Sequence, residues 1–282
     1  MTMLHSGAAD LERRFGGLKR LWGAGPYDAV RSSRVAVVGL GGVGSWAAEA
    51  LARCGVAELV LIDLDHVAES NINRQIQALD STLGVAKVQA LQARVGQIHP
   101  GCKVHAIEEF VEPQNWPQLL PSPVDVVIDA CDQSAAKFTL AAWALDGGSP
   151  LVTVGAAGGK YSPERVEVAD LTDVTHDPML ARLRQRLRQR VKQANPEGSA
   201  AQPLQAGAGV PRVARLSSSL HVTCVFSREE IRRPEDSCSV DGSLNCAGYG
   251  SSVMVTATFG MVAAEQALSI VRRSAASLDS LR

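Results

Sequence analysis

The chain has 282 residues, of which 46% are hydrophobic and 4% aromatic, and its formal net charge at pH 7 is −1. This size and composition suit one large α/β domain or two small ones and argue against an all-β module. Because the whole chain is nearly neutral, its overall charge does not attract nucleic acid, and such binding requires a local basic patch.

Strands and helices alternate in the first half of the chain. A short amphipathic helix with basic flanks is predicted at residues 11–22. Apolar, β-branched runs predict strands at residues 34–39, 58–63, 103–107, 125–129 and 151–154. Helices are predicted between them at residues 45–54, 83–97 and 134–145. This alternation predicts an α/β fold with a doubly wound, mainly parallel sheet of Rossmann type, covered on both faces.

The second half is less regular. It predicts a basic helix at residues 178–193, a mobile loop rich in Gly, Pro, Ala and Ser at 195–219, a strand at 221–226 and a packed helix at 253–271. The last of these includes an almost wholly apolar run at residues 253–264. Glu265 and Gln266 interrupt this run, whereas a membrane span needs roughly 20 predominantly apolar residues. We therefore expect a buried core helix and no stable membrane insertion.

The six cysteines lack C-x-x-C spacing, which gives little support to a structural zinc site. The first residues lack a basic segment followed by an apolar one, which is the pattern of a signal peptide. We therefore expect a cytoplasmic protein with free thiols.

A glycine-rich turn follows the first predicted strand. Gly39, Gly41 and Gly44 match G-x-G-x-x-G in the strand–turn–helix context that this motif requires. Glycine permits the tight turn and the close backbone approach, and the next helix presents free N–H groups to a phosphate. Asp63 ends the second predicted strand, where it is placed to bind ribose hydroxyls. These residues alone fit NAD as well as ATP.

The charged residues near this turn favour ATP. A triphosphate carries roughly twice the charge of a dinucleotide's phosphates and recruits Lys, Arg and Mg²⁺. Asn71, Asn73 and Arg74 follow the second strand, and Lys87 lies on the next predicted helix. Asp132 follows Asp129 at the end of the fourth strand, where a magnesium ligand would lie.

Each of these residues also has an ordinary interpretation. Arg74 could form a surface ion pair, Lys87 could be a solvated helix residue, and Asp132 could be a helix N-cap. Their common position on one side of a parallel sheet favours ATP over NAD.

Together these segments resemble the ubiquitin-activating-enzyme-like superfamily, which includes the molybdopterin- and thiamine-pathway adenylyltransferases. The resemblance rests on residues 39–44, Asp63-x-Asp65, Ser70-Asn71-x-Asn73-Arg74-Gln75, Lys87 and Asp129-Ala-Cys-Asp132. Within the superfamily, residues 14–17, 20–23, 41–53, 73–76 and 254–260 are similar to the branch that dehydrates threonylcarbamoyladenosine in tRNA. The absence of the zinc cysteines that many protein-activating members carry also favours this branch.

The resemblance implies an ATP-dependent, ligase-like reaction. ATP would adenylate the threonine carboxylate of threonylcarbamoyladenosine, next to the tRNA anticodon. The ureido oxygen would then attack within the same molecule, expel AMP and give a cyclic, dehydrated product. Adenylation converts a poor electrophile into a good one, and the tethered nucleophile gains from proximity.

The resemblance also implies roles for the site residues. Those expected to bind ATP are Gly39, Gly41, Gly42, Gly44, Asp63, Asp65, Asn71, Asn73, Arg74, Gln75 and Lys87. Three residues are expected to act in catalysis: Arg74 and Lys87 neutralise the departing pyrophosphate, and Asp132 holds Mg²⁺. A homodimer is implied, with Arg14 as the candidate for a residue lent across the interface, although Gly17 stands where some relatives carry a second arginine.

We expect residues 1–282 to form one ATP-binding adenylating domain whose C-terminal part extends the same domain. Residues 1–33 would be an N-terminal helical arm, residues 34–155 the nucleotide-binding half, and residues 156–282 the half for substrate and dimer contacts.

The predicted basic helix carries Arg182, Arg184, Arg186, Arg188, Arg190 and Lys192. A solvated helix face is the ordinary interpretation. Since the charges surround much of the helix without i,i+4 ion pairs, and given the resemblance, we favour contact with the tRNA backbone.

The resemblance also raises the question of sulfur chemistry. Cys246 could accept sulfur, as in protein-activating relatives, and the resemblance implies a cysteine desulfurase or sulfur-acceptor partner. Ring closure needs no thiol nucleophile, so we expect Cys246 to be a small buried side chain and Cys131 to line the site.

Two other functions stay open. One is adenylation of the C-terminus of a ubiquitin-like sulfur-carrier protein, which would use zinc cysteines and a groove for a Gly-Gly tail. The other is a non-catalytic scaffold for a sulfur-transfer partner that retains nucleotide binding. Incubation with ATP and either modified tRNA or a carrier protein would distinguish these possibilities.

Overall fold

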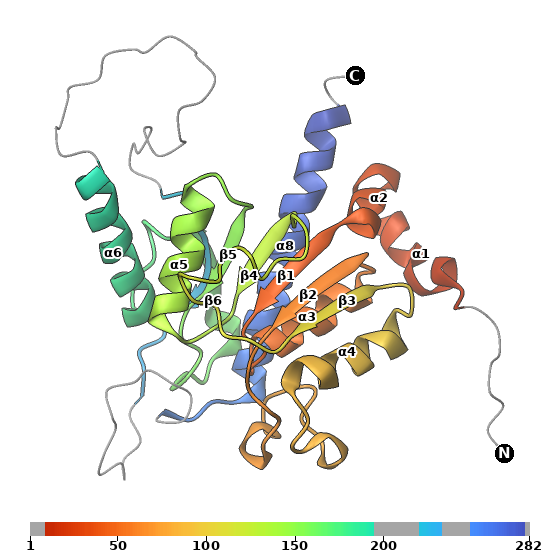
Figure 1. Ribbon diagram of the computed structural model, residues 1–282, viewed down its shortest axis with the longest axis horizontal. Helices are drawn as coiled ribbons and strands as arrows, with labels where there is room; N and C mark the ends of the chain where they lie inside the picture. Colours follow the sequence, from red (N-terminus) through yellow and green to blue (C-terminus); the bar gives the residue numbers. More distant parts are fainter. Residues whose placement is uncertain (1–8, 195–219, 233–248, 280–282) are drawn as a thin grey trace.

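The computed structural model describes residues 9–194, 220–232 and 249–279 (Figure 1). Within them, a seven-stranded sheet has the order β3-β2-β1-β4-β5-β7-β6. Its strands are β1 (Arg34–Val38), β2 (Glu58–Ile62), β3 (Lys103–Ile107), β4 (Val126–Asp129), β5 (Leu151–Val154), β6 (Val166–Asp170) and β7 (Thr223–Ser227). Neighbouring strands are parallel except β6 and β7, which are antiparallel. The predicted fold class is thus confirmed, and β6 and β7 extend the same sheet.

Helices cover both faces of this sheet. They are α1 (Leu11–Trp22), α2 (Ala24–Ser32), α3 (Gly44–Arg53), α4 (Lys87–Ile98), α5 (Ser134–Leu145), α6 (Pro178–Ala194) and α8 (Val253–Asp279). Short 3-10 turns occur at η1 (Glu69–Asn71), η2 (Asp80–Thr82) and η3 (Pro163–Arg165). Figure 1 places α1 and α6 at opposite ends of the molecule, with the sheet between them.

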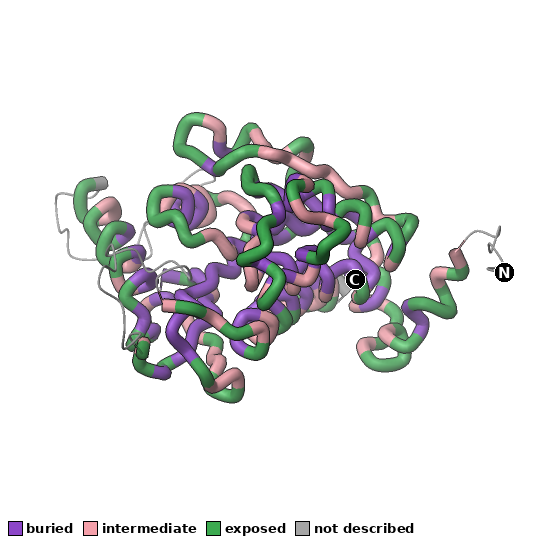
Figure 2. Tube along the Cα trace, turned by 90° about the horizontal axis from the view of Figure 1, so that it is seen from below, coloured by how far each residue is buried: buried purple, intermediate pink, exposed green. Residues whose placement is uncertain are grey.

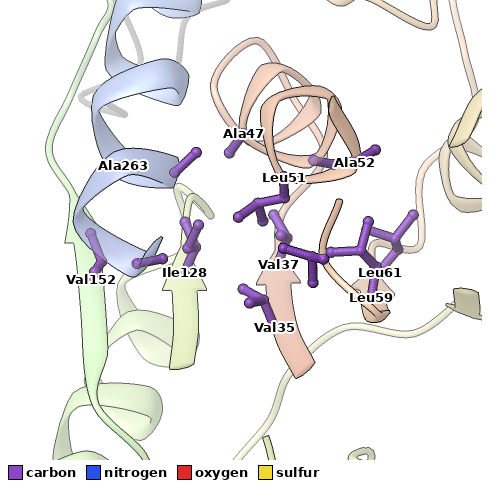
Figure 3. Close-up of a cluster of buried hydrophobic side chains, with 14 of the residues drawn as sticks. Val35, Val37, Ala47, Leu51, Ala52, Leu59, Leu61, Ile128, Val152 and Ala263 are labelled. Carbon is purple, nitrogen blue, oxygen red and sulfur yellow. The ribbon is translucent and has the colours of Figure 1, made fainter. Parts of the chain in front are cut away.

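The strands build two cores because alternate side chains point to opposite faces. Val35 and Val37 of β1 belong to the cluster that contacts α3, α4 and α8, and Figure 3 shows Ala263 of α8 beside that face. Ala36 and Val38 belong to the cluster formed with α5 and α6. In Figure 2 the buried segments accordingly run through the interior between exposed outer surfaces.

Several boundaries differ from the sequence predictions. The helix predicted from residue 83 begins at Lys87, because residues 80–82 form η2 and Gly84 has φ of +80°. Helix α2 and strand β6 were not predicted, and α8 continues beyond residue 271 to Asp279. The predicted loop at residues 195–219 lies outside the described residues.

Helix α8 is long and apolar enough to cross a membrane by these two criteria alone. One face of the helix nevertheless packs inside the protein. Phe259, Ala263 and Ala267 are fully buried, and the helix contacts α2 and α3. This packing supports the prediction of a core helix.

Candidate active site

A cavity of about 600 Å³ lies at the carboxyl ends of β1, β2, β4 and β5. The chain leaves β1 for β2 and β3 on one side and reaches β4 and β5 on the other, so the cavity occupies the switch point of the sheet. Most predicted ATP-binding residues line it, namely Gly39, Gly41, Gly42, Asp63, Asp65, Asn71, Arg74, Gln75 and Lys87. Asp132 lines the same cavity, whereas Gly44 and Asn73 do not.

The glycine turn is shaped by close backbone packing. Gly39 has φ of +84°, and a Cβ atom there would lie 2.7 Å from the backbone nitrogen of Cys131. A Cβ atom on Gly44 would lie 1.8 Å from the carbonyl oxygen of Gly39. Gly44 therefore allows α3 to begin directly against the turn, although it does not line the cavity. The free N–H groups at the start of α3 lie beside the cavity-lining turn, an arrangement suited to anions.

Asp63 is fixed at the end of β2 by two backbone groups. Its Oδ2 accepts a hydrogen bond from Leu40 N at 2.5 Å, and its Oδ1 accepts one from Asp65 N at 2.8 Å. Burial raises the pKa of this carboxyl, while the Lys87 charge and the two N–H groups oppose that change. The carboxylate is thus held against the glycine turn, as a ribose-binding group would be.

Lys87 brings a buried ammonium to the cavity. Its Nζ lies 2.7 Å from Asp65 Oδ2, and the side chain of Lys87 is 7% exposed whereas that of Asp65 is 56% exposed. The backbone joins the same two residues, since Lys87 N donates to Asp65 O at 3.0 Å. A phosphate in the cavity would therefore meet a cation that has already lost most of its water.

Residues 69–75 form the loop that carries Arg74, here called the Arg74 loop, and hydrogen bonds hold it both internally and to Trp46 and Ser251. Arg74 Nη1 donates to Ser70 O at 2.6 Å and to Asn73 Oδ1 at 3.0 Å. Trp46 Nε1 donates to the Arg74 carbonyl at 2.9 Å, and Asn73 Nδ2 donates to Ser251 O at 3.1 Å. Asn73 therefore positions Arg74 from outside the cavity.

Asn71 stabilises the same loop from the cavity side. Its Oδ1 accepts a hydrogen bond from Ala68 N at 3.1 Å, and the residue is buried at the end of η1. Gln75 is also buried and accepts a hydrogen bond from Gln77 Nε2 at 3.1 Å. Both side chains line the cavity while they hold the loop in shape.

The two aspartates after β4 have different environments. Asp129 is fully buried, and its Oδ2 lies 2.8 Å from Lys137 Nζ and 2.5 Å from Thr153 Oγ1. Asp132 is exposed and lines the cavity. Because oxygen ligands suit Mg²⁺, Asp132 retains the features of a metal ligand, whereas Asp129 is committed to the core.

Cys131 lies between these aspartates and lines the cavity. Its Sγ donates to Asp129 Oδ1 at 2.9 Å. Burial and then the nearby Asp129 charge raise the pKa of the thiol well above its usual value. Cys131 is therefore a neutral thiol, which disfavours a role as nucleophile.

Three basic side chains of helix α6 contact neighbouring segments of the protein. Arg184 Nη1 donates to the carbonyl oxygens of Leu171 at 3.2 Å and Val174 at 2.6 Å. Arg186 lies 4.1 Å from the ring centroid of Phe138, and Arg190 Nη2 lies 2.5 Å from Asp146 Oδ2.

The other three basic side chains of α6 are exposed. Arg182 lines the cavity, and Arg188 and Lys192 follow it along the helix. Among the described residues, these three have no hydrogen bond or ion pair. They are the charges of α6 that remain available to a ligand.

Several cavity residues were not anticipated from the sequence. They are Phe110 and Val111 after β3, Gly155 to Ala157 after β5, Met179 of α6 and Thr256 of α8. Residues 155–157 directly follow a predicted parallel strand, so their place at its carboxyl end could have identified them. Met179 and Thr256 carry no such local signal.

Arg14 contacts its own chain. Its Nη1 donates to the carbonyl oxygens of Gln97 at 3.4 Å and Ile98 at 2.5 Å, at the end of α4. The residue does not line the cavity, so a role across a dimer interface stays a prediction. Cys246 lies outside the described residues.

Comparisons with known proteins show which proteins this chain resembles. The ThiF family model matches residues 17–279. A relative from Escherichia coli (strain K12), named tRNA threonylcarbamoyladenosine dehydratase, is 39% identical over 94% of this chain and 95% of its own length. A Haemophilus influenzae relative with the same name is 36% identical over 91% of this chain and 92% of its own.

A solved structure resembles the fold closely. It is the tRNA N6-threonylcarbamoyladenosine dehydratase of E. coli, TcdA, in complex with ATP. It is 37% identical, with a TM-score of 0.78, and the match covers 95% of this chain and 98% of that one.

Proposed function

The chain belongs to the ThiF family, and from this premise we propose that it uses ATP to dehydrate threonylcarbamoyladenosine in tRNA. The observation that carries the proposal is the cavity at the switch point, which gathers Asp63, Arg74 and Lys87 around the glycine turn. The printed names of the E. coli and H. influenzae relatives support tRNA as the substrate in preference to a sulfur-carrier protein.

The reaction has two group transfers. The threonine carboxylate attacks the α-phosphorus of ATP, the bond to the bridging oxygen breaks, and pyrophosphate leaves. The ureido oxygen then attacks the activated carbonyl carbon, AMP leaves, and a proton is lost from the ureido nitrogen. The net change in the nucleoside is the loss of one water molecule.

The chain's own residues orient the nucleotide and balance charge. Asp63 accepts hydrogen bonds from the ribose hydroxyls, and the N–H groups of the glycine turn and α3 face the phosphates. Lys87 and Arg74 then meet the negative charge that develops on pyrophosphate. Preorganised cations in a site with little water stabilise such charge strongly.

We also propose that Asp132 helps to bind Mg²⁺. Its exposed carboxylate in the cavity has the oxygen chemistry that this ion takes, and Asp129 next to it is occupied by Lys137. The remaining ligands would be phosphate oxygens and water. When bound, the ion would neutralise phosphate charge.

For tRNA contact, we propose Arg182, Arg188 and Lys192 of α6. Their lack of partners among the described residues supports this choice. Arg184, Arg186 and Arg190 instead hold the helix against the protein. Arg182, at the cavity wall, would lie nearest to the modified nucleoside, and the other two would meet the phosphate backbone further along.

A cytoplasmic homodimer also belongs to the proposal. The exposed side chains of Met254 and Met261 on α8 support an interface, since large apolar side chains gain from being covered. The division into an arm and two halves of one domain is supported by the single sheet that runs through both halves. A sulfur-transfer partner rests on family resemblance alone.

The test supplies the purified protein with ATP and tRNA that carries threonylcarbamoyladenosine. We expect AMP to form and mass spectrometry of the digested tRNA to show a nucleoside lighter by one water. Unmodified tRNA is the matched control and gives no AMP. Arg74→Ala should abolish AMP release with its fold intact. AMP that forms with a sulfur-carrier protein but not with modified tRNA would reject the proposal.

A further inference from the structure

Thr256 has an unusual environment for a threonine in a helix. It lies in the first turn of α8, is fully buried and lines the cavity. Its Oγ1 has no hydrogen-bond partner in the described part of the chain. A buried hydroxyl without a partner costs free energy, so it calls for an explanation.

Other threonines in helices donate their hydroxyl to a backbone carbonyl of the same helix. Thr258, two residues further along α8, donates to Met254 O at 2.7 Å, and Thr139 of α5 donates to Ala135 O at 3.0 Å. Both bonds reach the carbonyl four residues back. The corresponding acceptor for Thr256 is Ser252 O, which already accepts two backbone N–H groups, from Val255 at 3.2 Å and from Thr256 at 3.0 Å.

Thr256 and Arg74 both lie against the glycine turn at Gly42. A Cβ atom on Gly42 would lie 3.1 Å from Thr256 Cγ2 and 3.2 Å from Arg74 Cγ. One turn later, a Cβ atom on Gly260 would lie 2.4 Å from Val43 O. Helix α8 therefore rests directly on the turn that cradles the phosphates, and this contact fixes the position of Thr256.

We propose that the Thr256 hydroxyl donates a hydrogen bond to the β- or γ-phosphate of ATP. This inference rests on the proposed ATP site and deepens it, because it assigns a phosphate ligand to the C-terminal helix. The position beside Arg74, which serves the departing pyrophosphate, selects the β- and γ-phosphates over the α-phosphate. The ligand satisfies the hydroxyl that the protein alone leaves unpaired.

The matched substitutions are Thr256→Val, Thr256→Ser and Thr258→Val. Valine keeps the shape of threonine and removes the donor, so Thr256→Val should weaken ATP binding about tenfold. It should leave AMP binding unchanged, because AMP lacks the two outer phosphates. Thr256→Ser restores the donor and should bind ATP normally. Thr258→Val alters the same helix away from the cavity and should also bind ATP normally.

Dissociation constants for ATP and AMP are measured by calorimetry with the full chain and no tRNA. Thermal unfolding without nucleotide should show Thr256→Val at least as stable as the native protein, since it removes an unpaired buried hydroxyl. Native ATP affinity in Thr256→Val, equal weakening of ATP and AMP, or failure of Thr256→Ser to restore binding would each overturn the inference. A protein that binds ATP in this pattern but releases no AMP with modified tRNA would reject the proposed function alone.

Discussion

Two lysine–aspartate pairs lie at the same edge of the sheet and serve different purposes. Lys87 Nζ lies 2.7 Å from Asp65, and Lys137 Nζ lies 2.8 Å from Asp129. The distances are nearly equal, but burial differs. The side chains of Lys137 and Asp129 are 1% and 0% exposed, whereas that of Asp65 is 56% exposed.

This difference separates a structural pair from the pair that we propose binds the nucleotide. Lys137 also donates to Thr153 Oγ1 and Val154 O, so its three N–H groups are satisfied inside the protein. Burial, the largest effect, lowers the pKa of Lys137, but the Asp129 charge, the hydrogen bond to Asp129 and other nearby negative groups together more than offset it, and the pKa is raised. Asp65 can be rehydrated if Lys87 turns to a phosphate, whereas Asp129 cannot.

The largest expected effect follows from breaking the buried pair. Lys137→Ala leaves the Asp129 carboxylate buried without its cation, which typically costs about 3–5 kcal/mol. Urea denaturation should therefore show a large loss in the free energy of unfolding. Lys87→Ala is the matched control and should lose only about 1 kcal/mol or less, because Asp65 remains in water. Equal losses in the two variants would contradict the comparison.

The partly exposed pair, Lys87 and Asp65, should matter for turnover. Lys87→Ala removes a cation next to the phosphates and should slow AMP release by about 100-fold, as removal of one charge-stabilising donor typically does. Single-turnover assays with ATP and modified tRNA provide the rate. A Lys87→Ala enzyme with near-native turnover would show that this pair, too, is only structural.

The same distinction divides the basic residues of α6. Arg188→Gln with Lys192→Gln removes two charges that have no partner among the residues the structure describes, and it should weaken tRNA binding about tenfold at low salt. The slope of log Kd against log salt should fall by about 1–2. Arg190→Gln, whose arginine already pairs with Asp146, is the control and should change both quantities little. Salt titrations that coincide for all three proteins would remove α6 from the tRNA surface.

A contact between two basic side chains, Arg31 and His99, should make stability depend on pH below neutrality. Arg31 Nη1 lies 2.7 Å from His99 Nε2, and burial followed by the Arg31 and Arg14 charges lowers the pKa of His99 from 6.5 to about 4. The folded-state pKa of His99 lies below its unfolded value. The free energy that neutral His99 contributes to folding is therefore fully present above pH 6.5 and is lost as the pH falls through about 4.

This acid sensitivity can be measured by thermal unfolding between pH 7 and pH 4. The stability advantage of the native protein over His99→Gln should shrink as the pH falls, because glutamine does not titrate. A constant difference across this range would show that His99 keeps an ordinary pKa.

The sequence predicted the parallel strands well, because buried strands need continuous apolar runs, and β1 and β2 have such runs. Strand β6 was missed although Val166-Glu167-Val168 alternates with period two, since a single edge strand gives only a short signal. Helix α2 was missed because Gly25 and Pro26 lie in its first turn, where they resemble a loop.

The site was predictable where it is local in the chain. Asp63 and Arg74 follow β2 within a short segment, so one motif identifies both. Met179 and Thr256 reach the same cavity from helices far along the chain, and only tertiary packing places them there. Likewise, the sequence does not show that Asp129 is neutralised by Lys137 while its neighbour Asp132 is exposed.

The hydrogen bond from Trp46 to the Arg74 carbonyl gives this protein a natural spectroscopic label. Indole fluorescence responds to the loss of a polar partner, and Trp46 is partly buried beside the loop that carries Arg74. Replacing Trp22, Trp116 and Trp143 by phenylalanine would leave Trp46 as the single emitter. Its emission would then report any change in this hydrogen bond when nucleotide is added, in real time and without any attached dye.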